Sequence, residues 1–451
     1  MAKQDYQNKK KQLVETLQQL SKKNRAIRLQ KDTSNLFRDH NLKHQNKIDV
    51  RAFNQVIKVD PARLIAEVEA MTPFSTIVKE TLKYHCLPLV VPELKSITIG
   101  GALSGVGIEA SSFRYGFVHD GITQFEVLTG SGKIIECSAD NEYSDLFYAF
   151  PNSYGTLGYA LKATIKLIAA GPFVKLTHYH FSNAGVFFKE LEALCLANHI
   201  TGDLAFIEGV IFNADDLVIT TGEFVNQAPS VSNYKYLQIY YKSLQQKSQD
   251  YLTTEDFIWR WDPDWFWCSR VFGMQNTVLR FLLGKWLLKS TAYWKMMRLV
   301  NKNPLANYFY QRRKLHRETI IQDVLIPIEQ SVNFYEFFAK NINITPIWIC
   351  PYMAYHTAKP YNFFPTEANR LYVDFGFWDS VQSNENKGYY NRLIENKVTE
   401  LGGLKSLYSE AFYSEAQFWQ IYDKNHYQNL KQKYDPNQIL NDLYKKCVLS
   451  L

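Results

Sequence analysis

The stretch ITIGGALSGVGIEASSFRY, residues Ile97–Tyr115, decides how the rest of this chain is interpreted. A second cluster, NSYGTLG at Asn152–Gly158, has the same character. Both segments carry little charge and are rich in Gly, Ser and Thr, so their backbone can approach a ligand closely and point N–H groups at a phosphate. Together the two segments favour a nucleotide-binding site.

Two other interpretations of the first segment compete with this one. Residues 105–110, GVGIEA, fit the G-x-G-x-x-A dinucleotide fingerprint, and Glu126 lies at about the offset expected for a ribose-binding acid. A Rossmann turn must open a helix, however, whereas aromatic residues and glycines interrupt Phe113–Gly121. The next run, Phe125–Cys137, predicts a hairpin, which leaves no room for a crossover helix. A glycine-rich loop with a purely structural role is the other alternative.

The two glycine segments resemble the FAD-binding domain of the vanillyl-alcohol oxidase type, and within it the delta-24-sterol reductases and their relatives. The likeness covers roughly residues 25 to 447, so motifs that are weak alone become specific together. The further motifs that carry it are SDLFYA at Ser144–Ala149, QDVLIP at Gln322–Pro327, PIWICP at Pro346–Pro351 and LYVD at Leu371–Asp374.

The resemblance implies an α+β fold with a PCMH-type FAD-binding domain and an antiparallel-sheet substrate domain. The FAD-binding domain is expected over residues 1–170 and completed by about 425–451, and the substrate domain over 171–424. The residue patterns after Gly171-Pro172 also predict an antiparallel sheet for the substrate domain, because the order strand, helix, strand, strand occurs twice. The expected segments are 174–181, 184–199, 204–212 and 217–224, then 320–326, 329–340, 346–352 and 371–378.

Between these two units, residues 234–317 form an aromatic and basic insertion that is expected to be helical. A helical wheel separates an apolar side from a basic side. The apolar side has Leu282, Leu283, Trp286, Leu287, Trp294, Met297 and Val300, and the basic side has Arg280, Lys285, Lys289, Lys295, Arg298 and Lys302. Such a helix can lie at a lipid interface. It can equally pack over the substrate domain with its lysines in water.

Composition limits the partners and the compartment. The 451 residues have a formal net charge of +7 with lysines spread along the chain, so nucleic-acid binding is not favoured, while contact with an acidic membrane surface stays open. The aromatic content of 15% suits a site for flat or apolar ligands. The six cysteines have no metal-like spacing, which predicts reduced thiols in an intracellular protein and no metal site. No run approaches the ~20 apolar residues of a spanning helix, so we expect a cytoplasmic protein, soluble or peripheral on the cytoplasmic membrane face.

For contacts with FAD, the resemblance implies residues of three loops whose small or hydroxyl-bearing side chains allow close backbone approach. None of the loops has a His or Cys as an attachment point, so the flavin is expected to bind without a covalent link. The implied residues are Ser34 and Asn35, then Ile99, Gly100, Gly101, Ser104, Gly105, Ile108, Ser111 and Ser112, then Gly155, Thr156 and Gly158.

The catalytic residues are implied by the same resemblance. The related decaprenylphosphoryl-ribose oxidases place a lysine near the flavin where this chain has about Ser409, which argues against oxidation of a sugar alcohol. Saturating a carbon–carbon double bond takes a hydride from flavin and a proton from an acid. The candidates for proton transfer are Tyr408, Glu410, Asp323 and Tyr352.

The function that the resemblance implies is reduction of a carbon–carbon double bond of a sterol or other lipid-like small molecule, with NADPH reducing the flavin. Two alternatives stay open. One is a dehydrogenase or oxidase of an alcohol or polyprenyl sugar that uses quinone or oxygen. The other is a flavin or lipid binder on a membrane without turnover. The sequence sets no oligomeric state.

Overall fold

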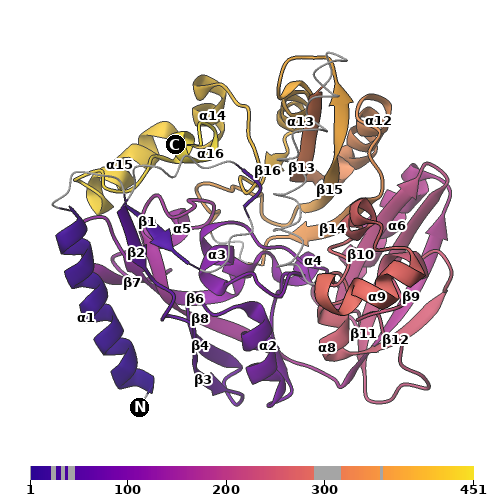
Figure 1. The fold of residues 1–451 in the computed structure, drawn as a ribbon, viewed down its shortest axis with the longest axis horizontal. Helices are drawn as coiled ribbons and strands as arrows, with labels where there is room; N and C mark the ends of the chain where they lie inside the picture. The colour runs from indigo at the N-terminus through magenta and orange to yellow at the C-terminus, as the bar shows by residue number, and fades with distance from the viewer. Residues whose placement is uncertain are drawn as a thin grey trace.

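Two antiparallel sheets organise the part of the chain that the structure describes, with helices packed around them (Figure 1). This computed structural model describes residues 2–21, 27–31, 36–38, 46–288, 316–355 and 359–450. The predicted α+β fold class is confirmed. The predicted contacts Ser34 and Asn35 lie outside the described residues.

The first sheet has the strand order β3-β4-β8-β6-β7, with β5 paired to β8. Its two sequence-local hairpins arise where alternating β-rich runs flank short polar turns, as predicted for β6 and β7. The strands are β3 (Val56–Asp60), β4 (Ile65–Glu69), β5 (Cys86–Pro88), β6 (Ile122–Leu128), β7 (Ile134–Ser138) and β8 (Tyr159–Ala169). A separate parallel pair joins β1 (Ile27–Gln30) to β2 (Asn46–Asp49).

The first glycine segment packs on this sheet as short helices. They are α3 (Ile99–Ser104), α4 (Ser112–Tyr115) and the 3-10 helix η1 (Val118–Gly121), and α2 (Phe74–Leu82) precedes them. The chain then enters β6, whose partners β7 and β8 are antiparallel. The Rossmann alternative is therefore wrong, because no crossover helix to a parallel strand follows the glycines. Its proposed ribose acid, Glu126, instead pairs with Lys10 at 2.8 Å and Lys162 at 3.0 Å.

The second sheet has the order β12-β9-β11-β10-β14-β15-β13-β16. The doubled strand, helix, strand, strand order is confirmed, and the four central strands come from both units. The strands are β9 (Phe173–Phe181), β10 (Phe206–Asn213), β11 (Asp216–Val225), β12 (Gln249–Thr253), β13 (His316–Pro327), β14 (Ile347–Met353), β15 (Leu371–Ser383) and β16 (Leu404–Lys405).

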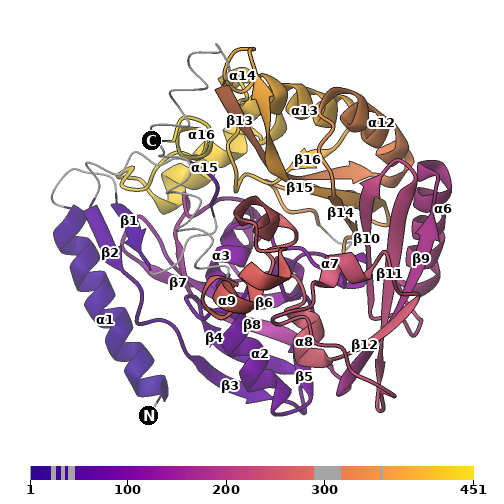
Figure 2. The same ribbon diagram turned by 45° about the vertical axis from the view of Figure 1, so that its right-hand side comes forward.

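The two faces of the second sheet pack against different layers. One face packs under α6 (Ala184–Asn198), α12 (Ser331–Asn341) and α13 (Tyr389–Glu400), with η3 (Ile328–Gln330) before α12 (Figure 2). Because strand side chains alternate, the opposite face, which includes Ile321 and Trp378, joins the core of the first sheet. A substrate or cofactor bound between the sheets would therefore meet this inner face.

The part of the insertion that the structure describes is only partly helical, which corrects the prediction for those residues. It contributes β12 to the sheet edge and short helices on the inner side of the second sheet: α7 (Tyr240–Ser243), α8 (Thr254–Ile258), η2 (Cys268–Phe272) and α9 (Thr277–Leu287) (Figure 2). Several aromatic residues of this segment, such as Trp261 and Trp267, are fully buried in the core shared with the first sheet. The insertion therefore fills the space between the sheets.

Helix α9 buries its basic residue Arg280 and exposes apolar side chains. Arg280 is only 1% exposed and forms a double contact with the buried Asp264 carboxylate, whereas Leu282 is 63% exposed and Leu283 is 46% exposed. The predicted position of Arg280 on a water-facing side is wrong, because Asp264 gives its charge a buried partner. The remaining wheel residues lie outside the described side chains: Lys285, Trp286, Leu287, Lys289, Trp294, Lys295, Met297, Arg298, Val300 and Lys302.

The C-terminal helices α14 (Glu415–Ile421), α15 (Lys424–Tyr434) and α16 (Leu443–Cys447) return to the first sheet (Figure 1). The Ser131 N–H donates to the Tyr434 carbonyl oxygen at 3.0 Å, and the Ile27 N–H donates to that of Ile439 at 2.8 Å. Helix α5 (Ser144–Ala149) is joined to α15 by a hydrogen bond from Tyr434 to Asp145. At the other end of the chain, α1 (Ala2–Ser21) lies on the same sheet, where Lys9 pairs with Glu69.

Candidate active site

Three segments that are far apart in sequence meet beside Tyr154. The Tyr154 N–H donates to the Ser104 carbonyl oxygen at 2.8 Å, and the Asn152 N–H donates to that of Gly105 at 3.0 Å, so the two glycine segments are bonded directly. From the N-terminal loop, the Arg38 guanidinium lies 4.8 Å from the centre of the Tyr154 ring. The structure therefore brings together the second and third predicted loops and the described end of the first.

The predicted hydroxyl groups at this junction already have partners within the chain. Ser104 donates to the Gly100 carbonyl oxygen and Ser111 to that of Leu89, both at 2.8 Å, and Thr156 donates to its neighbour Ser153 at 2.8 Å. Ser112 accepts a hydrogen bond from the Glu109 N–H at 3.0 Å. Toward a ligand, Ser104, Ser111 and Thr156 can accept a hydrogen bond, or donate one if they give up their present bond, whereas Ser112 can still donate.

The predicted backbone donors of α3 are also bonded. The Ile99 N–H donates to the Thr72 carbonyl oxygen at 3.1 Å and the Gly100 N–H to that of Ala70 at 2.7 Å. A Cβ on Gly100 would lie 2.8 Å from Ala70, so this glycine is required by close packing on the first sheet. Gly101 donates to the Thr98 cap, and Ile108 is buried in the core. Gly155 has φ +75°, a conformation that favours glycine, and its neighbour Gly158 leads into β8.

Two of the predicted catalytic residues lie together on the inner face of the second sheet. Asp323 is buried, and burial raises the pKa of its carboxyl to about 7, although a hydrogen bond from Tyr408 opposes this shift. The Tyr408 hydroxyl accepts from the Trp378 indole N–H at 3.0 Å. The Asp323 Oδ1 atom has no hydrogen-bond partner. The pair thus presents a carboxyl group that can carry a proton near neutral pH.

Asp374 was missed by the sequence analysis. On the antiparallel strands, Asp323 pairs with Gly376 and Asp374 with Leu325, so the two carboxyl groups are diagonal neighbours on one face. Burial and the Asp323 charge raise the pKa of Asp374, and its Oδ2 atom has no partner. The signal was present in LYVDFGF, where an acid interrupts an apolar strand.

A hollow that is open to solvent is lined in part by Phe37 and Trp378, and both of these side chains contact Tyr408. Its apolar walls include Phe37, Trp265, Ile321 and Trp378, and its polar side includes Arg317. Ile321 and Trp378 are direct partners across the sheet, two residue pairs along from Asp323 and Gly376. Their side chains therefore lie on the same face of the sheet as Asp323. An apolar group entering the hollow would approach the surroundings of Tyr408.

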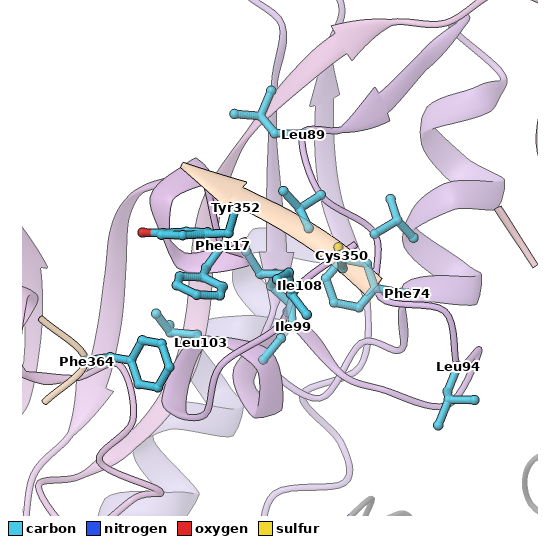
Figure 3. Close-up of a cluster of buried hydrophobic side chains, with 14 of the residues drawn as sticks. Phe74, Leu89, Leu94, Ile99, Leu103, Ile108, Phe117, Cys350, Tyr352 and Phe364 are labelled. Carbon is cyan, nitrogen blue, oxygen red and sulfur yellow. The ribbon is translucent and has the colours of Figure 1, made fainter. Parts of the chain in front are cut away.

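Tyr352 lies apart from this pair. The Tyr352 ring stacks on Phe117 with centroids 3.9 Å apart, and its hydroxyl bonds Thr366 at 2.8 Å, so it lies in a filled part of the contact between the sheets (Figure 3). The structure does not bring Tyr352 into the Asp323 cluster. The backbone carbonyl oxygen of Glu410 accepts from Lys405, whose ammonium pairs with the buried Glu395, and a catalytic role of the Glu410 carboxylate stays a prediction.

A buried ionic triad joins the first glycine segment to the second sheet and the insertion. Arg260 lies 2.8 Å from Glu109 and 2.9 Å from Glu208, and the side chains are at most 3% exposed. The Trp261 and Trp348 indoles each donate to Glu208 at 3.0 Å. Burial raises the pKa of Glu109 to about 7, although the charge of Arg260 opposes this shift. For Glu208, which shares the same cation, Arg260 and its other hydrogen-bond donors hold the pKa below its usual value despite burial. Sequence spacing gives no sign of this triad.

Known proteins are similar to this chain both in the FAD-binding domain and over most of its length. The profile of the FAD binding domain family matches residues 7–138. The delta(24)-sterol reductase of Pisum sativum is 25% identical over 440 residues, which cover 89% of this chain and 76% of that protein. The human delta(24)-sterol reductase is 28% identical over 426 residues, with 88% and 75% covered. An oxidoreductase from the fasciation locus of Rhodococcoides fascians is 35% identical over 158 residues, 34% of this chain and 35% of that protein.

These likenesses confirm the resemblance from the sequence motifs, including the PCMH-type FAD-binding domain. They extend far beyond the matched domain, into the strands that carry Asp323 and Asp374. The chain therefore fits the delta-24-sterol reductase-like FAD-binding family, and it is an FAD-dependent oxidoreductase.

Proposed function

We propose that this oxidoreductase reduces a carbon–carbon double bond of a sterol or another lipid-like molecule, with NADPH as the electron source. The observation that carries the proposal is the proton-bearing pair Asp323 and Tyr408 beside a hollow with aromatic walls. A lipid substrate needs apolar walls, and saturation of an alkene needs an acid. The sterol reductases among the relatives support the same substrate class.

The residues present fit FAD as the cofactor, bound without a covalent link. Glycine-rich segments meet at Tyr154, and the buried Nε and Nη2 atoms of Arg38 have no partner there. FAD, when bound, supplies the hydride that one alkene carbon accepts. We place it in a domain formed by residues 1–170 and 425–451, an arrangement supported by the contacts of Tyr434 and Ile439 with the first sheet. Residues 171–424 then form the substrate domain.

In this proposal the chain moves one proton. Asp323 holds it near neutral pH, because its buried carboxyl favours the neutral form. Tyr408, positioned by Trp378, bonds that carboxyl and also contacts Phe37, which like Trp378 lines the hollow. The second alkene carbon receives the proton, and the bond is saturated. Trp378 and Phe37 exclude water from the reacting face.

The test uses the purified protein loaded with FAD under anaerobic conditions. We expect NADPH to bleach the oxidised-flavin absorbance, and a sterol with a side-chain double bond to restore it. The saturated counterpart of that sterol is the matched control and should leave the flavin reduced. Flavin that stays oxidised with NADPH but is bleached by an alcohol or polyprenyl sugar would replace the reductase with an oxidase. Acid precipitation should release the flavin into the supernatant.

We also propose that the protein is cytoplasmic and contacts the membrane peripherally through α9. Its exposed face carries Val278, Phe281 and Leu282, which are 65%, 64% and 63% exposed. Apolar side chains spaced three and four residues apart on a helix form one continuous strip. Within the described residues, no helix has the length and apolar character to span a bilayer. A lipid-like substrate could then pass from the bilayer surface to the protein.

The double substitution Phe281→Glu with Leu282→Glu should lower co-sedimentation with acidic phospholipid vesicles by at least about tenfold, since each apolar side chain contributes roughly 1.5–3 kcal/mol when buried. The control pair is Val186→Glu with Leu196→Glu, two residues of α6 that are each 56% exposed. These should leave vesicle binding unchanged. Equal vesicle binding by wild type and the α9 variant would rule out this contact.

A further inference from the structure

Arg38, which is buried, and Lys446, which is half-buried, are two cations beside the third glycine segment. Arg38 is 5% exposed, and one of its nitrogens, Nη1, donates to the Leu407 carbonyl oxygen. The Lys446 ammonium donates to the Tyr154 carbonyl oxygen at 2.6 Å. The Arg38 guanidinium lies over the Tyr154 ring at 4.8 Å. Both charges thus converge on the residue where the glycine segments meet.

Within the described residues, no carboxylate pairs with either cation. Burial and the charge of Arg38 lower the pKa of Lys446 to about 7, and Lys31 and Lys431 add to this effect. Lys431 is matched by Asp435 at 2.6 Å. In contrast, Nε and Nη2 of Arg38 are buried without any hydrogen-bond partner. A protein keeps unmatched buried cations only at a cost in stability, which an anion would remove.

The arrangement of the two unbonded nitrogens of Arg38 favours a phosphate group as the anion. Nε and Nη2 lie on one edge of a guanidinium and donate in parallel, which matches two oxygens of a phosphate. Lys446, which donates to the Tyr154 carbonyl oxygen, adds a second positive charge at the same residue, so the two cations suit an anion with two phosphate units. The adjacent Tyr154-Gly155 backbone allows close approach, because Gly155 has φ +75° and no side chain.

We propose that Arg38 and Lys446 bind the pyrophosphate of FAD. The proposal rests on FAD being the cofactor and is independent of the lipid substrate. Arg38 supplies the two-pronged hydrogen bond and Lys446 the second positive charge, while Leu407 and Tyr154 hold the two side chains in place. The ring system of the flavin is bound elsewhere, so ligands with and without phosphates should separate the two contributions.

The experiment measures binding of FAD, ADP and riboflavin to the apoprotein by flavin fluorescence and calorimetry. Arg38→Met and Lys446→Met should each weaken binding of FAD and ADP by about 10- to 100-fold, the effect of a charge-assisted hydrogen bond. Riboflavin binding should not change. Lys433→Met is the matched control, because Lys433 is half exposed on α15 and pairs with Asp145, and it should bind all three ligands as wild type does.

The thermal unfolding temperature gives a second readout, because the substitution that weakens FAD binding should not lower the unfolding temperature of the apoprotein. Arg38→Met should unfold at the same or a higher temperature than wild type as apoprotein, because an unmatched buried charge is removed. It should gain less stability from saturating FAD. A role of Arg38 in packing alone would lower the apoprotein temperature and leave the FAD gain intact. Arg38→Lys keeps the charge without the parallel donors and should bind FAD with intermediate affinity.

The outcomes separate this proposal from the proposed function. Equal weakening of FAD and riboflavin, or unchanged FAD affinity in both variants, overturns the pyrophosphate site while the protein remains a flavoenzyme. A raised KM for NADPH in FAD-loaded Arg38→Met with unchanged FAD affinity assigns the cations to the nicotinamide nucleotide and also overturns it. Wild-type protein that takes up no FAD at all contradicts the proposed function itself.

Discussion

Asp323→Asn should lower the rate of double-bond reduction by about 10²- to 10⁴-fold, the usual contribution of a positioned general acid. The amide retains the shape of the carboxyl group and cannot donate an acidic proton. FAD binding and its reduction by NADPH should be unaffected, since neither uses this proton in the proposed scheme. Stopped-flow measurement of flavin reoxidation by the lipid substrate isolates the affected step.

The pH dependence follows from the direction of the Asp323 shift. Because burial raises its pKa to about 7, the wild-type reoxidation rate should fall as the pH rises above about 7. The neutral carboxyl also contributes to the free energy of unfolding. This contribution is lost as the pH rises from the ordinary pKa of an aspartate through about 7. Asp323→Asn should therefore resist unfolding better than wild type at alkaline pH.

The matched control for this substitution is Glu318→Gln. Glu318 lies on the same strand, is 5% exposed and accepts hydrogen bonds from Asn391, but it is on the opposite face of the sheet. Its variant should keep the wild-type pH profile of reoxidation. A wild-type reoxidation rate in Asp323→Asn would remove this residue from the chemistry.

Arg260→Met should lower the free energy of unfolding by about 3–5 kcal/mol, the cost of leaving buried charges without their partner. Both Glu109 and Glu208 would lose the cation that they share. The loss should be largest at pH 8 and smaller at pH 5, because protonation relieves two unpaired carboxylates. Chemical denaturation at the two pH values measures the difference.

The control is Arg270→Met, which removes the same charge from a partly exposed pair with Asp379. Since solvent-exposed ion pairs contribute about 0–1 kcal/mol, this variant should stay close to wild type at both pH values. If Arg260→Met were as stable as Arg270→Met, the triad would not hold the first glycine segment to the second sheet.

The sequence predicted the sheets better than the site. Short apolar runs in β10, β11, β14 and β15 reveal strands locally, and a polar turn reveals the hairpin of β10 and β11, so both units of the second sheet were found. Ile349 and Cys350 look equivalent in sequence, yet only the register of β14 sends the second toward the first sheet.

The predicted site could not be assembled from local patterns because its contacts are long range. Asp323 was chosen by resemblance, but its neighbour Asp374 becomes visible only when β13 and β15 pair. Arg260 and Glu109 are 151 positions apart, and their pairing follows from the packing of the insertion. Arg280 shows the same limit, since a helical wheel contains no information on its buried partner Asp264, which lies outside the helix.

The bond between Ile27 and Ile439 has a consequence for biogenesis. During translation, the strand that contains Ile27 must wait for this bond until the segment that contains Ile439 has left the ribosome. Loading of the yellow cofactor would accordingly be a late, post-translational event, and truncated products of a premature stop codon should emerge colourless.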